Sequence, residues 1–154
     1  MYRRPVRPLG DVYALDLTGE ERDVVKHLLQ ELRELVEEDD ALVQRLFPPA
    51  HRDDPEASAA FAELAREGLV EGRRTAIDAV LASVDRDRLS HGEVEAWCGV
   101  LNDVRLVLGE RLGVTEELYV AGIDRRDPRA PQLALYGWLT WLQGEIVEVL
   151  AMRL

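Results

Sequence analysis

Three polar residues interrupt an otherwise apolar helical stretch, and their types and spacing make them the best candidates for chemistry. Asn102, Asp103 and Arg105 lie among leucines and valines, and Arg73 falls on the apolar side of an earlier predicted helix. A buried polar group must be hydrogen-bonded and a buried charge must be paired, or the fold loses stability. An inward arginine at position 73 therefore needs an acid, and Asp103 is the candidate partner.

These four residues support two interpretations. In the functional one, they line a small polar pocket that binds a small molecule or carries out catalysis. In the structural one, they form a buried network that fixes how the helices pack, and we favour it because structural ion pairs produce the same pattern. Replacing Asp103 by alanine is expected to destabilise the fold strongly, because the change would strand a buried arginine.

The helix that carries three of these residues is the best-delimited element of the sequence. Ser90 is a suitable N-cap, and Glu93 three residues later completes a capping box. Gly113 suits the left-handed position that ends many helices. Gly99 and Gly109 lie inside the helix, where glycine costs about 1 kcal/mol relative to alanine. We therefore expect a neighbouring helix to approach closely at both glycines.

Three further helical regions flank this one, and each is indicated by apolar residues at steps of three and four. The first begins at Thr18, where Glu21 completes a second capping box. It is expected to end or bend near Asp40, after four consecutive acidic residues. The second follows a proline-containing loop and is expected to break near Gly68. The last extends from about residue 131 to residue 153.

The N-terminal segment has a different character. Arg3, Arg4 and Arg7 make its start basic, whereas the rest of the chain is acidic. The residues that follow alternate in the manner of a strand, which predicts a short β-hairpin or an extended arm lying on the helices. We expect the three arginines to be solvated rather than clipped onto the acidic body.

Length and composition fit one globular domain. The chain has 154 residues, of which 47% are hydrophobic, so it can bury a sizeable core. The predicted fold is all-α, with one domain over residues 1–154. Residues 1–18 form the arm or hairpin, and residues 19–154 form a bundle of four to five helices.

Charge and missing motifs exclude several functions. The formal net charge of −11 disfavours binding to nucleic acid. No apolar run is long enough for a membrane span and no secretory signal is visible, which predicts a cytoplasmic protein without a membrane role. The three histidines, His27, His51 and His91, do not lie in metal-binding patterns, and no nucleotide-binding motif occurs. We therefore expect no metal, cofactor or catalytic residue, and we lean against an enzyme.

Aromatic residues crowd the first half of the last helix. Tyr136, Trp138 and Trp141 make this half apolar on almost every side. Burial in the core is the simpler explanation. The functional explanation is an interface with a protein partner, or with a second copy in a homodimer, because tryptophan and tyrosine are frequent at association hot spots.

One sequence pattern resembles a known family. The run Leu101–Leu112, LNDVRLVLGERL, with Trp97 before it, is similar to an actinobacterial domain-of-unknown-function family of small acidic helical proteins. The closing YGWL at Tyr136–Leu139 and the Phe47-Pro48 pair extend the resemblance over most of the chain. That family has no established activity, so the resemblance implies no catalytic residue. Its genes tend to lie beside the ClpS adaptor of the Clp protease, which implies a link to protein turnover.

These observations leave two main functional hypotheses and one minor one. The first is a non-enzymatic protein-interaction or regulatory module, linked to Clp-dependent proteolysis. The alternative is a small-molecule-binding or enzymatic helical domain with a polar pocket at Arg73, Asn102, Asp103 and Arg105. The minor one is an acidic mimic of nucleic acid, which would require carboxylates spread over one surface.

Overall fold

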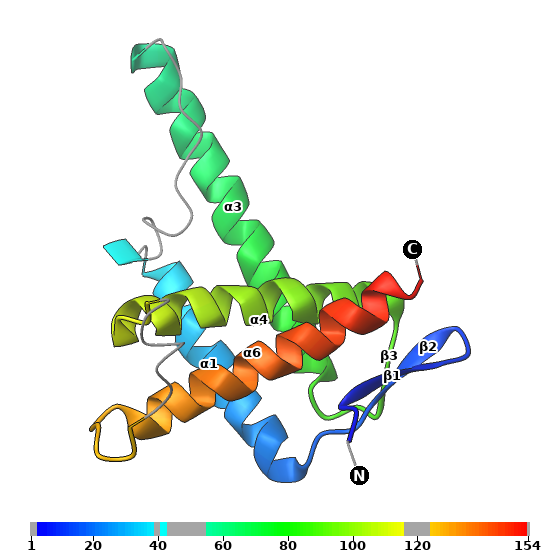
Figure 1. Ribbon diagram of the computed structural model, residues 1–154. Coiled ribbons are helices and arrows are strands. Elements are labelled where there is room, and N and C mark those ends of the chain that lie inside the picture. Colours follow the sequence, from blue (N-terminus) through cyan, green and yellow to red (C-terminus); the bar gives the residue numbers. More distant parts are fainter. Residues whose placement is uncertain (1–2, 39–40, 43–54, 116–123, 154) are drawn as a thin grey trace.

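Four long helices and a small antiparallel sheet make up the described part of the chain (Figure 1). The computed structural model describes residues 3–38, 41–42, 55–115 and 124–153. Its helices are α1 (Gly19–Glu37), α3 (Pro55–Ser83), α4 (His91–Leu112) and α6 (Ala130–Ala151). The Phe47-Pro48 pair, His51 and Asp40 lie outside the described residues. The prediction of a mainly helical fold is confirmed, although the fold is not strictly all-α.

The sheet extends further than the predicted hairpin. Strands β1 (Val6–Leu9) and β2 (Val12–Leu15) pair antiparallel around a turn in which Gly10 has a φ of 58°, a left-handed value that favours glycine. The hairpin itself is thus confirmed. A short third strand, β3 (Arg88–Leu89), pairs with β2 just before α4 begins. Two residues carry too little pattern to be identified as a strand from sequence.

Local capping signals in the sequence are matched by the structure. Thr18 and Glu21 form a reciprocal capping box at the start of α1, and Ser90 and Glu93 form one at the start of α4. Gly113 ends α4 in the left-handed conformation with a φ of 65°. Helix α1 ends at Glu37, the first residue of the acidic run in which it was expected to end or bend.

Two predictions about glycine are wrong. Helix α3 passes through Gly68 without a break, and a Cβ atom added there would meet nothing within 4 Å. An exposed glycine that costs about 1 kcal/mol does not by itself interrupt a long helix. Gly99 also faces open space, so close packing does not explain it. Gly109 does allow a close approach, because an added Cβ would lie 3.1 Å from a ring carbon of Tyr136.

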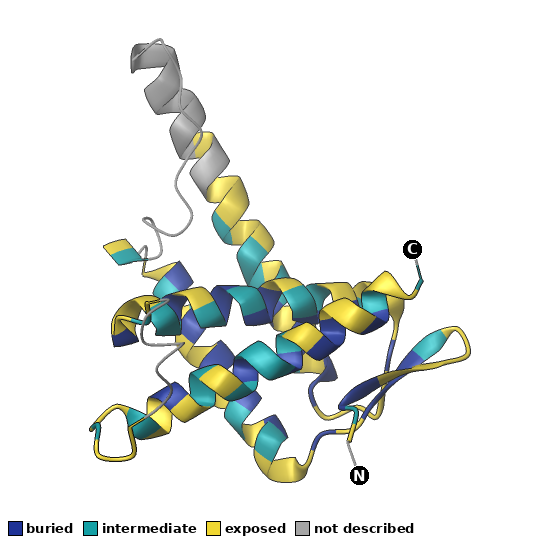
Figure 2. Ribbon diagram, in the orientation of Figure 1, coloured by how far each residue is buried: buried dark blue, intermediate teal, exposed yellow. Residues whose placement is uncertain are grey.

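Helix α4 is the centre of the packing. It lies alongside α6, and it also packs against α3, α1 and β2 (Figure 1). The buried faces of these elements point toward one another and form one hydrophobic core (Figure 2). Its largest fully buried side chains include Trp97, Tyr13, Leu29, Ile77 and Leu101. No helix in the described ranges combines the length and apolar character that crossing a membrane requires.

The N-terminal arginines correct another expectation. Arg3 binds both carboxylate oxygens of Glu21, at 2.8 and 2.9 Å, and Arg4 lies 3.5 Å from a carboxylate oxygen of Glu148. Strand β1 packs against α6, and this contact brings the two arginines within reach of acids on two helices. Ion pairs of Arg3 and Arg4 therefore hold the N-terminal segment against the helices, although each ion pair remains partly exposed.

Candidate functional site

Arg73 and Asp103, the central residues of the predicted network, meet where α3 packs against α4. Arg73 Nη1 donates to Asp103 Oδ2 at 2.8 Å. The Asp103 side chain is only 4% exposed, whereas the Arg73 side chain is 35% exposed. The acid therefore lies inside the protein, and the arginine reaches it from the surface along its aliphatic stem.

This geometry corrects the expected effect of Asp103→Ala. The premise of that expectation was a buried arginine, but the guanidinium of Arg73 retains access to water. Removing the acid would leave a hydrated cation rather than a stranded one. We therefore expect Asp103→Ala to cost no more than about 1–2 kcal/mol, the range for one lost hydrogen bond.

A pH-dependent stability follows from the buried acid. Burial raises the pKa of Asp103 from 3.8 to about 6, and the attraction of Arg73 offsets only part of this rise. Because the folded state holds its proton to a higher pH than the unfolded state, stability is lost as the pH rises from about 4 to about 6.

Asp103→Asn should abolish this loss while keeping an oxygen that accepts from Arg73. Between about pH 4 and pH 7, the wild-type protein should lose about 2–3 kcal/mol relative to the variant. Urea unfolding of both proteins at several pH values measures the difference. Stability curves that run parallel over this interval would show that Asp103 ionises normally in the folded protein.

Arg105 belongs to a different contact, between α4 and α6. Its Nη1 donates to Gln143 Oε1, and its guanidinium carbon lies 5.6 Å from the centre of the Tyr136 ring. The Cys98 thiol also hydrogen-bonds Gln143, and burial raises the pKa of that thiol. A thiol with a raised pKa forms little of the reactive thiolate, so the surroundings of Cys98 do not favour nucleophilic chemistry.

The four predicted polar residues are therefore divided between two sides of α4. Asp103 faces Arg73 on α3, whereas Arg105 faces α6, because side chains two positions apart on a helix point in different directions. Asn102, the residue directly before Asp103, is half-buried. These contacts act between helices, and they give no support to a shared pocket.

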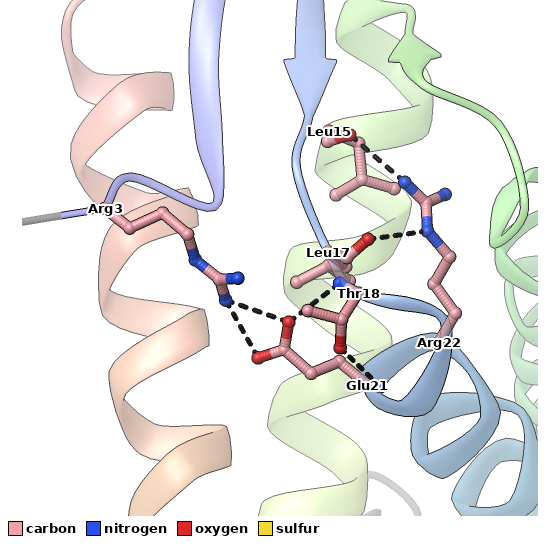
Figure 3. Close-up of polar contacts among 6 residues, drawn as sticks. All are labelled: Arg3, Leu15, Leu17, Thr18, Glu21 and Arg22. Atoms are coloured by element: carbon pink, nitrogen blue, oxygen red, sulfur yellow. Dashed lines mark hydrogen bonds and ion pairs between the residues drawn. The ribbon is translucent and has the colours of Figure 1, made fainter.

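One heavily hydrogen-bonded polar side chain among the described residues was missed by the sequence analysis. Arg22 is 9% exposed and lies near the start of α1 (Figure 3). Its acceptors come from the end of β2, the segment leading into α1, and the segment between α3 and β3: the carbonyl oxygens of Leu15, Leu17, Val84 and Arg86, and the carboxylate of Asp87. One guanidinium thus joins three separate parts of the chain.

A signal for Arg22 did exist in the sequence. It lies four residues after the Thr18 N-cap and three residues before Val25, so it occupies a position on the apolar face of α1. The same argument that identified Arg73 as inward applies to it. Its partners are backbone carbonyls, however, and no sequence pattern indicates those.

A second unpredicted cluster fastens the hairpin to the helices. The hydroxyl of buried Tyr13 lies 2.9 Å from Nδ1 of His91, whose Nε2 lies 2.8 Å from a carboxylate oxygen of Glu95. Arg153 stacks on the Tyr13 ring, with its guanidinium carbon 4.2 Å from the ring centre, and donates to the carbonyls of Gly10 and Val12. The Tyr13 side chain is fully enclosed, so this chain of hydrogen bonds does not offer its hydroxyl to a substrate.

Acidic side chains do not assemble a metal site in the part of the chain that the structure describes. One of them is nevertheless unusual, because Glu145 on α6 is buried and its Oε2 has no hydrogen-bond partner among the described residues. Burial raises the pKa of Glu145, and the neighbouring charge of Glu148 raises it further. A raised pKa favours the neutral acid, which is the form that burial tolerates.

The predicted aromatic interface is half-buried along its length. Tyr136, Trp138 and Trp141 are each partly covered, and both tryptophans pack against the edge of the core. Trp138 and Leu135 also line an open hollow of about 320 Å³ between α6 and the start of α1. The aromatic side of α6 therefore contributes to the core and to the surface at once.

The fold defines a class of mainly helical proteins in which a small N-terminal sheet is fastened to a helical body by buried arginine and tyrosine contacts. The chain belongs to the domain-of-unknown-function family DUF2017, which it matches over residues 3–150. This confirms the resemblance to such a family that the LNDVRLVLGERL run carries.

Relatives of this chain from Mycobacterium are named as regulators. Proteins named oxidative stress regulator AosR, from Mycobacterium bovis and Mycobacterium tuberculosis, are each 31% identical to this chain over 131 residues. The matched region covers 72% of this chain and 58% of each relative, so the chain spans little more than half of their length. No solved structure matches the sequence significantly.

Proposed function

We propose that this protein is a non-enzymatic regulatory module that acts by binding a protein partner through the aromatic side of α6. The observation that carries this proposal is the half-buried Trp138 at the edge of an open apolar hollow. A tryptophan in such a position provides a large contact area and is frequent among the residues that dominate binding energy.

Two further observations support a regulatory role. The relatives from Mycobacterium are named as regulators, and the polar residues most suited to chemistry are engaged in contacts between helices. A small-molecule pocket at Arg73, Asn102, Asp103 and Arg105 remains the alternative hypothesis, and the contacts described above do not favour it.

The finer parts of this proposal concern partner and location. A component of the Clp degradation machinery is one candidate partner, because genes of the resembling family tend to lie beside that of ClpS. A second copy of the chain, forming a homodimer, is another. We also propose that residues 1–154 act as one domain, in the cytoplasm and without nucleic acid.

Affinity capture tests the proposal with a matched pair of variants. The tagged protein, incubated with lysate of its native host, should retain a partner in stoichiometric amount. Trp138→Ala should weaken that binding by about tenfold or more, the effect expected at a hot spot. Val147→Ala removes apolar surface at an exposed position on the same helix and should leave binding unchanged.

Two results would contradict the proposal. One is the absence of any stoichiometric partner with the wild-type protein, provided that light scattering also shows a monomer. The other is equal loss of binding in the two variants, because a general effect on α6 would not single out Trp138. Circular dichroism must show that both variants remain folded.

A further inference from the structure

The hollow between α1 and α6 has an apolar wall and an acidic edge. Val24 on α1 faces Leu135 and Trp138 on α6, and all three side chains are half-buried. Glu20 and Glu21, at the start of α1, complete the lining. Residues three or four apart lie on one side of a helix, so this arrangement places the acids and Val24 on the same face of α1.

The acidic edge already binds a basic side chain of the protein itself. Glu21 accepts from Arg3 through both carboxylate oxygens, and Figure 3 shows Arg3 reaching across to α1 from the N-terminal segment. Its neighbour Glu20 is exposed and has no ion-pair partner within the described residues. One carboxylate of the pair is therefore occupied by a guanidinium, and the other is available to a cation from outside.

We propose that this hollow binds a basic amphipathic segment of a partner protein. One large apolar side chain of the segment enters between Val24, Leu135 and Trp138, and a lysine or arginine beside it pairs with Glu20. The inference rests on the proposed function and deepens it by stating the chemistry of the partner.

Charge favours a basic protein segment over two other possible occupants of the hollow, a second copy of the chain and an anionic lipid surface. A second copy of the chain would bring a second acidic edge and a further net charge of −11 to the contact, which opposes association. An anionic lipid surface would be repelled by Glu20 for the same reason. A basic protein segment satisfies both the apolar wall and the carboxylate, in the way that amphipathic helices occupy grooves on other proteins.

Synthetic peptides provide the test, with the full chain as the receptor. A leucine–lysine peptide of about 14 residues, roughly four helical turns, presents the proposed chemistry. A leucine–glutamate peptide of the same pattern and a serine–lysine peptide serve as controls. Titration into ¹⁵N-labelled protein should shift the indole N–H signal of Trp138, which a Trp138→Phe variant identifies, and only the leucine–lysine peptide should do so.

A pair of charge reversals on one helix tests the role of the acidic edge. Glu20→Lys should weaken binding of the leucine–lysine peptide by roughly fivefold, the effect of losing an exposed ion pair and adding a repulsion. Glu34→Lys makes the same change on α1 outside the hollow and should alter binding by less than about twofold. Both variants must give wild-type circular dichroism.

Several outcomes would overturn the inference. Equal weakening in the two variants would show that the peptide follows net charge alone. Binding of the serine–lysine peptide with equal strength would exclude an apolar contact. A Trp138 signal that shifts with protein concentration alone would assign the hollow to a second copy. If captured partners still depend on Trp138 while no peptide binds, the inference fails and the proposed function stands.

Discussion

Arg22→Ala should lower the free energy of unfolding by about 3–5 kcal/mol, because it leaves several buried backbone carbonyls without a donor. Four carbonyl oxygens accept from this guanidinium, at distances from 2.7 to 3.2 Å. They belong to segments that are up to 64 positions from Arg22 in sequence, so the loss would also loosen the attachment of the sheet to α1. Urea unfolding followed by circular dichroism measures the change.

Two control variants distinguish the hydrogen bonds that the buried Arg22 guanidinium donates from the effect of its positive charge. Arg22→Lys keeps the charge but cannot reach all of these acceptors, so it should retain only part of the stability. Asp87→Ala removes the one acidic partner, whose side chain is 91% exposed, and should cost less than about 1 kcal/mol. If Arg22→Ala and Asp87→Ala had equal effects, the backbone carbonyls would not matter.

Trp97→Ala should cost about 3–5 kcal/mol, the range for removing a large aromatic side chain from a core. Trp97 is fully buried on α4, the helix that contacts all of the other long helices. Its indole Nε1 also donates to Ser83 Oγ at 2.8 Å, and Ser83 Oγ donates to the Val80 carbonyl. Truncation would therefore leave a cavity and remove the donor to a buried hydroxyl at the end of α3.

Two variants divide this effect into packing and hydrogen bonding. Trp97→Phe retains much of the ring volume, and Ser83→Ala removes the hydroxyl. In a double-mutant cycle of unfolding free energies, the coupling between the two changes should be about 1 kcal/mol, the usual net value of a hydrogen bond. A coupling near zero would show that the indole contributes through packing alone.

The parts of the fold that sequence predicts best are those encoded locally. Both capping boxes and the glycine at position 113 depend on residues within one helical turn, and each is present where it was expected. The hairpin also follows from neighbouring residues and one glycine turn. The third strand differs, because its two residues become a strand only when β2 is beside them.

The candidate site could also be predicted only in part from the sequence. The sequence analysis predicted the contact between Arg73 and Asp103, because an arginine on the apolar face of a helix needs an acidic partner. It did not separate Arg105 from them, because it treated neighbours in sequence as neighbours in space. The hollow beside Trp138 could not be predicted, since its two walls come from helices more than a hundred positions apart.

The hydrogen bonds that Arg153 donates to the hairpin have a consequence for folding during protein synthesis. Its acceptors, Gly10 and Val12, are 143 and 141 positions earlier in the chain. The ribosome synthesises the chain from its N-terminal end, so the hairpin is made long before α6 can pack against it. Contacts of such long range cost loop entropy and form slowly. During synthesis, the apolar face of the hairpin therefore stays uncovered until α6 has been made and can pack against β1.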